Sequence, residues 1–209
     1  MPLYEEIQRM TVEVAAQFAQ PQSRIYDLGC ATGTTLSLLT KAIHLSSVQF
    51  IGIDNSDAML SKAKDRLADA TTRRNLLLEN VDLNGTIEFS QASVIILNWT
   101  LQFVEPPNRI RLLGSIFTGL LDGGCLVVME KIFPNDASLT KLYTDFHHAF
   151  KRRNGYSDLE IAKKREALEN VLIPLRIEDN IALLQQAGFS LVDIFFRWYN
   201  FAGLIAIKR

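Results

Sequence analysis

A strand-like run that ends in an acid and a glycine turn most constrains what this chain can fold into. In the stretch RIYDLGCATG, apolar residues flank Asp27, and Gly29 and Gly33 follow before a helical pattern begins. A second strand-like run, residues 48–53, ends directly before Asp54. Glycines in such a turn let a ligand approach the backbone, and an acid after the second strand accepts hydrogen bonds from a ribose. The pattern predicts a Rossmann-like nucleotide site.

The acid ahead of the glycines discriminates between adenosine-bearing ligands. The dinucleotide fingerprint G-x-G-x-x-G receives a pyrophosphate at a helix N-terminus, whereas this chain reads D-x-G-x-x-x-G. Asp27 would repel a pyrophosphate but would attract a cation. S-adenosylmethionine carries a sulfonium and an ammonium group and no phosphate, so the motif favours that cofactor. The alternative is an ordinary strand–turn–helix unit that binds nothing.

Composition is typical of one α/β domain over residues 1–209, with 48% hydrophobic and 22% charged residues. The net charge of −1 gives no overall attraction to nucleic acid or to a membrane surface. Two cysteines, Cys30 and Cys125, fit a reducing cytoplasm and show no metal-ligand spacing. Since no apolar run is long enough to cross a bilayer, we expect a cytoplasmic protein with no metal and no membrane or nucleic-acid partner.

Strand-like and helical patterns alternate along most of the chain, which predicts a mostly parallel sheet. The expected strands are residues 25–28, 48–53, 76–83, 94–97, 125–129, 189–198 and 201–208, and the expected helices are 4–18, 34–43, one from 56, and one ending at 121. Only Tyr199 and Asn200 separate the last two strands, and two residues can close only an antiparallel hairpin. The expected α/β fold is Rossmann-like, of the class I methyltransferase type, with seven strands and a C-terminal antiparallel hairpin.

Residues 136–172 form an expected helical insertion that the core fold does not need. Ser157 and Glu160 have the spacing of a capping box, which starts a second helix in this insertion. Six cations lie within fifteen residues of it, at positions 151–153 and 163–165. They form either a solvated helix face or, for at least one of them, a contact with an anion in the active site.

Several phrases of this sequence resemble one family closely. They are YDLGC, IDNS, LNWTLQF, FKR followed by NGYS, and KR followed by LENV. Together they resemble the carboxy-S-adenosyl-L-methionine synthases, over residues 2–208. The resemblance implies an enzyme of the pathway that modifies the tRNA wobble uridine. Its members convert S-adenosylmethionine and prephenate to carboxy-S-adenosylmethionine and phenylpyruvate, and the carbon dioxide lost by prephenate is captured at the S-methyl carbon.

The resemblance also implies roles for particular residues. Arg165 would bind the new carboxylate as the catalytic residue, since a guanidinium holds a carboxylate bidentately, although an exposed i,i+4 partner is the other interpretation. Asp27 would bind the cofactor's amine. The other expected cofactor-binding residues are Tyr4, Gly29, Cys30, Ala31, Asp54, Asn55, Asp82, Leu83 and Asn98. Tyr4 could equally be a frayed aromatic at the chain end, and His147 and His148 are kept only as substrate-contact candidates.

The resemblance further implies a homodimer, with Arg165 presented across its interface, and transfer of the product to a downstream tRNA carboxymethyltransferase. Two departures are visible: relatives carry an additional segment ahead of Tyr4, and they more often have Ser at the position of Ala31. One rival is a plain methyltransferase that acts on the tRNA wobble uridine or on a small molecule. A second rival is a cofactor-binding scaffold without catalysis.

Overall fold

The computed structural model describes residues 3–45, 47–68, 75–168 and 171–209, with the side chains of Lys164 and Arg165 also outside the described part. The helices are α1 (Tyr4–Phe18), α2 (Thr34–Ala42), α3 (Asp57–Arg66), the 3-10 turn η2 (Leu101–Phe103), α4 (Pro106–Gly119), α5 (Ala137–Arg153), α6 (Asp158–Leu168) and α7 (Ile177–Gln186). The strands are β1 (Arg24–Leu28), β2 (Gln49–Asp54), β3 (Leu76–Asn80), β4 (Ala92–Asn98), β5 (Leu120–Phe133), β6 (Leu175–Arg176), β7 (Leu191–Trp198) and β8 (Phe201–Ile207).

Seven strands form the sheet in the order β3-β2-β1-β4-β5-β8-β7, and the short β6 pairs with the end of β5. Strands β3, β2, β1, β4 and β5 are parallel, whereas β8 is antiparallel to both β5 and β7. The predicted class I methyltransferase fold and its C-terminal antiparallel hairpin are thus confirmed.

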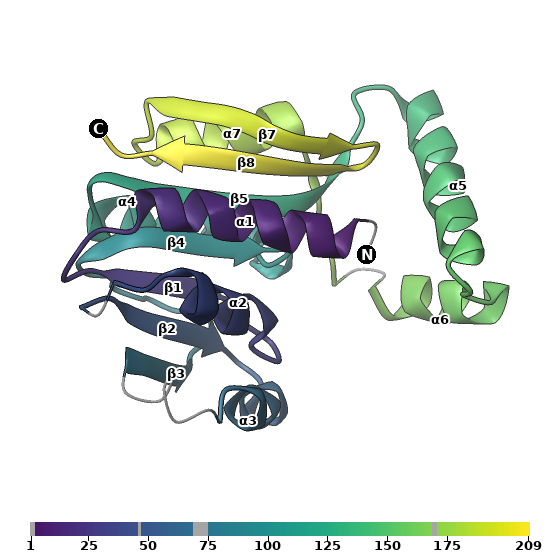
Figure 1. Cartoon of the computed structure of the whole chain (residues 1–209). Helices are drawn as coiled ribbons and strands as arrows, with labels where there is room; N and C mark the ends of the chain where they lie inside the picture. The colour runs from purple at the N-terminus through teal and green to yellow at the C-terminus, as the bar shows by residue number, and fades with distance from the viewer. Residues whose placement is uncertain (1–2, 46, 69–74, 169–170) are drawn as a thin grey trace.

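Helices cover both faces of the sheet, and each face has its own core (Figure 1). On one face, Ala15 of α1 and Leu36 of α2 pack with Ile25 and Val94. On the other face, α4 and α7 pack against the alternate residues of the same strands. Burial on both faces explains why β4 is apolar from Val94 to Leu97.

Element boundaries differ from the sequence prediction mainly around β5. This strand begins at Leu120 and continues to Phe133, so the expected helix end at residue 121 and the following pair Gly123 and Gly124 lie within the strand. Pairing with β8 extends β5 beyond Met129, because Glu130 and Lys131 pair with Ala202 and Phe201. Long-range pairing of this kind leaves no local pattern in the sequence.

Helices α5 and α6 form an arm that stands apart from the sheet, on the side toward which the arrows of β2 and β4 point (Figure 1). No residue of α5 is fully buried. The predicted capping box starts α6: the Ser157 hydroxyl accepts from the Glu160 backbone N–H at 3.3 Å, and the Glu160 carboxylate accepts from the Ser157 backbone N–H at 2.8 Å. The arm therefore begins at the edge where a parallel sheet presents its ligand-binding loops.

Candidate cofactor site at the carboxyl ends of the strands

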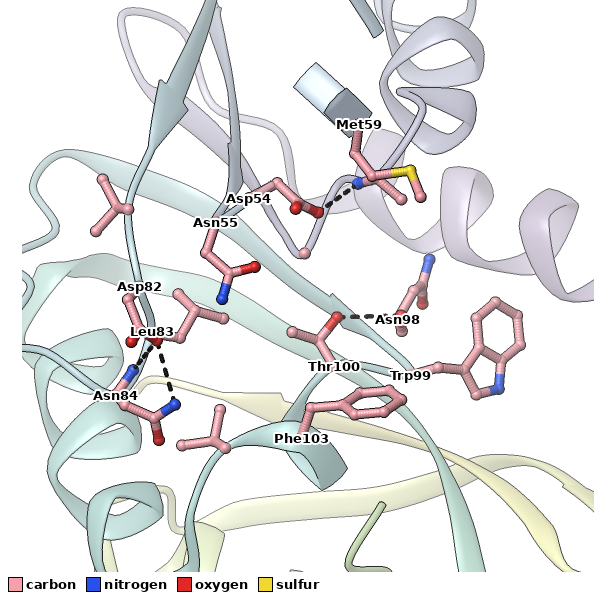
Figure 2. Close-up of a pocket in the computed structure, with 14 residues that line it drawn as sticks. Asp54, Asn55, Met59, Asp82, Leu83, Asn84, Asn98, Trp99, Thr100 and Phe103 are labelled. Atoms are coloured by element: carbon pink, nitrogen blue, oxygen red, sulfur yellow. Dashed lines mark hydrogen bonds between the residues drawn. The ribbon is translucent and has the colours of Figure 1, made fainter. Parts of the chain in front are cut away.

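A pocket of about 470 Å³ lies at the carboxyl ends of β1, β2, β3 and β4 (Figure 2). It is lined by Gly29, Ala31, Asp54, Asn55, Met59, Val81, Asp82, Leu83, Asn84, Asn98, Trp99, Thr100, Phe103 and Val104. A volume of this size is in the range of small-molecule sites. Four successive strand ends contribute to it, so the pocket depends on the register of the whole parallel sheet.

The glycine turn after β1 is fixed by backbone hydrogen bonds. The N–H groups of Gly29 and Cys30 both donate to the carbonyl of Ile53, at 2.7 and 2.9 Å. Gly29 has a φ of +73°, and a Cβ placed there would lie 2.4 Å from Oγ1 of Thr100. Both the backbone conformation and the space therefore require glycine at this position.

Asp54 holds the glycine turn from the neighbouring strand. One carboxylate oxygen accepts from the Ala31 N–H at 2.9 Å, and the other accepts from the Ser56 N–H at 2.9 Å. Each oxygen retains lone-pair capacity. The carboxylate can therefore accept hydrogen bonds from a diol in the pocket while it keeps the turn in place.

The loop after β3 forms the opposite wall, where Asp82, Leu83 and Asn84 lie (Figure 2). The Asp82 carboxylate accepts from the backbone N–H of Asn84 at 2.9 Å. The side-chain oxygen of Asn84 in turn accepts from the Glu105 N–H at 2.9 Å, which ties this loop to the start of α4. Asn84 is a lining residue that the sequence analysis missed, although the Asp-x-Asn-Gly pattern there is typical of a turn.

The chain leaves β4 through a strained turn that carries two further lining residues. Trp99 has a φ of +56°, which is uncommon for a side chain of its size. The Thr100 hydroxyl donates to the carbonyl of Leu28 at 2.8 Å and so joins the ends of β4 and β1. Tyr4 of α1 stacks on Trp99, with ring centroids 5.7 Å apart. Tyr4 therefore reaches the pocket through Trp99 and does not line it.

Beneath the pocket, several buried oxygen acceptors have no hydrogen-bond partner among the described residues. They are both carboxylate oxygens of Asp27, Oδ1 of Asn98 and Oε1 of Gln8. Burial, and secondarily the charge of Asp54, raises the pKa of Asp27 to about 7. Burial also raises the pKa of the Cys30 thiol, so this cysteine remains a thiol. Buried oxygen acceptors without a partner are suited to a cationic donor.

Two buried ionisable side chains, Glu130 and Arg109, support the wall formed by η2. The Glu130 carboxylate accepts from the N–H groups of Leu101 and Gln102, at 2.9 and 3.1 Å. Arg109, only 1% exposed, donates to the carbonyls of Val104 and Ile173, at 2.8 and 2.7 Å. Burial raises the pKa of Glu130 to about 8 and lowers that of Arg109. Arg109 thereby connects the pocket wall with the segment that returns from the arm.

Comparison with known proteins identifies the family. The synthase of Methylococcus capsulatus named carboxy-S-adenosyl-L-methionine synthase is 44% identical over 208 residues, which span 100% of this chain and 86% of that protein. Proteins of the same name from Trichlorobacter lovleyi and Pseudomonas syringae pv. tomato are 43% and 44% identical, over 93% and 99% of this chain and 80% and 85% of theirs. The chain belongs to the carboxy-S-adenosyl-L-methionine synthase family. It is therefore an enzyme, and family membership implies that it uses S-adenosylmethionine.

Methyltransferases share the fold of this family member. A methyltransferase domain family matches residues 25–124. The S-adenosylmethionine-dependent methyltransferase SibL superimposes with a TM-score of 0.61 at 16% identity, over 98% of this chain and 56% of that one. An O-methyltransferase family protein from Burkholderia thailandensis gives a TM-score of 0.69 at 15% identity, over 97% of this chain and 56% of that one. At these identities the likeness concerns the fold alone.

The structure brings together seven of the expected cofactor-binding residues as pocket lining: Gly29, Ala31, Asp54, Asn55, Asp82, Leu83 and Asn98. Asp27 and Cys30 lie beneath the turn, and Tyr4 lies behind Trp99. The side chain of Arg165 falls outside the described part, although its backbone belongs to α6. Besides Asn84, the lining residues that the sequence did not predict are Met59, Val81, Trp99, Thr100, Phe103 and Val104.

Two other features are absent from the part of the chain that the structure describes. No group of three or more His, Cys, Asp and Glu side chains is placed to hold a metal ion. None of the described helices combines the length and the apolarity needed to cross a bilayer.

Proposed function

We propose that this protein is a carboxy-S-adenosyl-L-methionine synthase that uses prephenate, in the pathway of tRNA wobble uridine modification. The overall reaction converts S-adenosylmethionine and prephenate to carboxy-S-adenosylmethionine, phenylpyruvate and water. The observation that carries the proposal is identity of 39–44% to proteins of this name over 93–100% of the chain, the arm included. The solved methyltransferases share the fold at only about a third of that identity.

The buried acceptors fit the amino-acid portion of S-adenosylmethionine. Asp27 and Gln8 would accept hydrogen bonds from its ammonium group, and Asn98 is placed to accept another. An ammonium has three donors and no acceptor, so it matches a group of unpartnered oxygens. In this proposal Asp54 and Asn55 hold the ribose, and Asp82 and Leu83 meet the adenine edge. Phe103 and Trp99, which also line the pocket, would help to exclude water from it.

The homodimer and the role of Arg165 belong to the same proposal. On α5, Leu139, Leu142 and Phe146 are 36%, 42% and 40% exposed, which favours cover by a second copy. Such a dimer would let α6 present Arg165 to the partner's cofactor. Sedimentation of the free protein tests the dimer. The cytoplasmic location and the transfer of product to a downstream tRNA carboxymethyltransferase are further parts of the proposal.

Incubation with S-adenosylmethionine and prephenate, followed by mass spectrometry, tests the reaction. The expected product is heavier than the cofactor by the mass of carbon dioxide, and phenylpyruvate appears in equal amount. Arg165→Ala should abolish carboxylation and largely keep S-adenosylmethionine binding, whereas Lys163→Ala on the same helix should change neither. A plain methyltransferase would leave prephenate untouched, and a scaffold would show no turnover.

A further inference from the structure

Cross-strand pairing places Lys131 next to an aromatic row on one face of the sheet. Lys131 of β5 pairs with Phe201 of β8, and Phe201 pairs with Trp198 of β7. Directly paired residues of antiparallel strands project to the same face. The stem of Lys131 and the rings of Phe201 and Trp198 therefore lie side by side, at the end of the sheet from which the arm departs.

His147 of α5 packs onto this row. Its ring lies 5.1 Å from that of Phe201 and 6.1 Å from that of Trp198, both in edge-to-face geometry. Its Nε2 atom is buried and has no hydrogen-bond partner among the described residues. A buried imidazole nitrogen without a partner is energetically unfavourable unless a ligand satisfies it.

The charges around His147 are positive. Burial is the main cause that lowers the pKa of His147 to about 3, and the charges of Lys151, Lys131 and His148 act in the same direction. The Lys131 side chain is half-buried, and burial lowers its pKa as well. Its ammonium makes no ion pair or hydrogen bond with a residue that the structure describes. A half-buried ammonium such as that of Lys131, without a counter-ion among the described residues, favours an anionic ligand.

The strand that carries Lys131 is joined to the wall of the cofactor pocket. The backbone N–H of Trp99 donates to the carbonyl of Met129 at 2.6 Å, two positions before Lys131 on the same face of β5. Trp99 lines the pocket, and its own indole N–H is buried without a partner. The strand that carries Lys131 is thus bonded directly to the Trp99 wall of the pocket, at the edge of the sheet where Asn98 and Asp54 end their strands.

Resting on the proposed function, we propose that Lys131 and His147 form the subsite for a carboxylate of the second substrate, an organic dianion. Lys131 supplies the charge and His147 a directional hydrogen bond, while Phe201 and Trp198 provide an apolar wall for the carbon skeleton. The subsite orients that substrate toward the cofactor across Trp99. Both groups are substrate-binding residues, so their loss should affect the second substrate and spare the cofactor.

Lys131→Met removes the charge and keeps the aliphatic stem, and His147→Phe keeps the ring packing and removes the nitrogen. We expect KM for prephenate to rise about 10- to 100-fold in Lys131→Met and about 2- to 10-fold in His147→Phe. The Kd for S-adenosylmethionine should stay within about twofold of wild type in both, which also shows that the variants fold. Lys141→Met, a charge removed from an exposed position of α5, is the matched control and should alter neither constant.

The outcomes are distinguishable. An unchanged KM for prephenate in Lys131→Met overturns the subsite while the synthase assignment stands. Equal loss of S-adenosylmethionine affinity overturns it too, because the residues would then support the cofactor pocket. A wild-type protein that yields no carboxylated product overturns the proposed function and the subsite with it. Partial restoration of KM by Lys131→Arg supports the charge-based role.

Discussion

The glycine turn and the helical arm are held in place by different interactions. The turn is fixed by backbone N–H groups that donate to Ile53 and Asp54, with distances of 2.7–2.9 Å. The arm helix α5 has no fully buried residue and meets the sheet through ring contacts, such as Phe150 with Trp198 at 5.3 Å. Backbone bonding allows few arrangements of the turn, whereas ring packing allows the arm to repack.

This difference matches the two ligands of the proposed reaction. In the proposed site the cofactor would contact main-chain positions whose geometry is set before it arrives, which favours rigid placement of its reactive carbon. The second substrate would meet side chains of the arm and the hairpin, where a different anion could be accommodated by changing a few residues. Specificity should therefore evolve in the arm, and cofactor choice should stay with the turn.

Replacing one glycine of the turn and one glycine of the arm by alanine should give the largest difference between the two regions. Gly29→Ala forces a left-handed residue against Thr100, 2.4 Å from its Oγ1, and should destabilise the protein by about 2–5 kcal/mol and abolish S-adenosylmethionine binding. Gly155 has a φ of +85° with nothing within 4 Å, so Gly155→Ala adds only the backbone term of about 1–2 kcal/mol. Chemical denaturation and calorimetric titration measure both effects. Equal losses of stability and of cofactor affinity in the two variants would contradict the proposed difference between the turn and the arm.

The buried carboxylate of Asp27 should make the ligand-free protein less stable as pH rises. Its folded pKa of about 7 exceeds the ordinary value of 3.8, so the folded state binds the proton more tightly and stability falls between these two pH values. Asp27→Asn should remove up to about 4 kcal/mol of this pH dependence and weaken cofactor binding about 10- to 100-fold at pH 8. Thermal unfolding from pH 4 to pH 8 measures the first effect.

Bound cofactor supplies the control for Asp27. Saturating S-adenosylmethionine should flatten the pH dependence of wild-type unfolding, because its ammonium would pair with the carboxylate. A wild-type profile that is flat without cofactor, or one that Asp27→Asn leaves unchanged, would show that the carboxylate is already paired in the free protein.

The turn could be predicted from the sequence because its parts are local. Gly29, Asp27 and Asp54 sit at fixed spacings after apolar runs, and the antiparallel hairpin follows from a two-residue connection. The capping box at Ser157 is likewise complete within four residues. These features need no knowledge of which segments meet in space.

The missed features depend on contacts between distant segments. Asn84 bridges the loop after β3 to Glu105, and Glu130 accepts from Leu101 across two elements. Nothing in the sequence around Arg109 indicates a fully buried guanidinium, because arginine in an amphipathic helix is usually exposed. The sequence does not indicate the burial of Gln8 on α1 either, because that burial depends on how the helix packs against the sheet.

Removing Trp198 should loosen the arm without affecting the turn. Trp198→Ala deletes ring contacts with His147 and Phe150, worth about 1–3 kcal/mol together. Amide hydrogen exchange in α5 should accelerate about tenfold or more, while the Kd for S-adenosylmethionine stays within about twofold. Ile194→Ala, an exposed position of the same strand, is the control and should leave α5 protected. Unchanged exchange in Trp198→Ala would mean that other contacts hold the arm.

The smallest effect is expected from a serine-to-alanine change at a helix cap, made once beside the glycine turn and once in the arm. Ser56 caps α3 by accepting from the Met59 N–H at 3.3 Å, and Ser157 caps α6 by accepting from the Glu160 N–H at 3.3 Å. Each serine-to-alanine change should cost about 1 kcal/mol of local stability. Only Ser56→Ala should also weaken cofactor binding, by about two- to fivefold. Alanine keeps the backbone N–H that donates to the Asp54 carboxylate at 2.9 Å, but loss of the cap loosens the start of α3 that positions this N–H. If Ser157→Ala weakens cofactor binding equally, the arm and the turn are energetically coupled, and Arg109, which bonds to both Val104 and Ile173, is the residue placed to couple them.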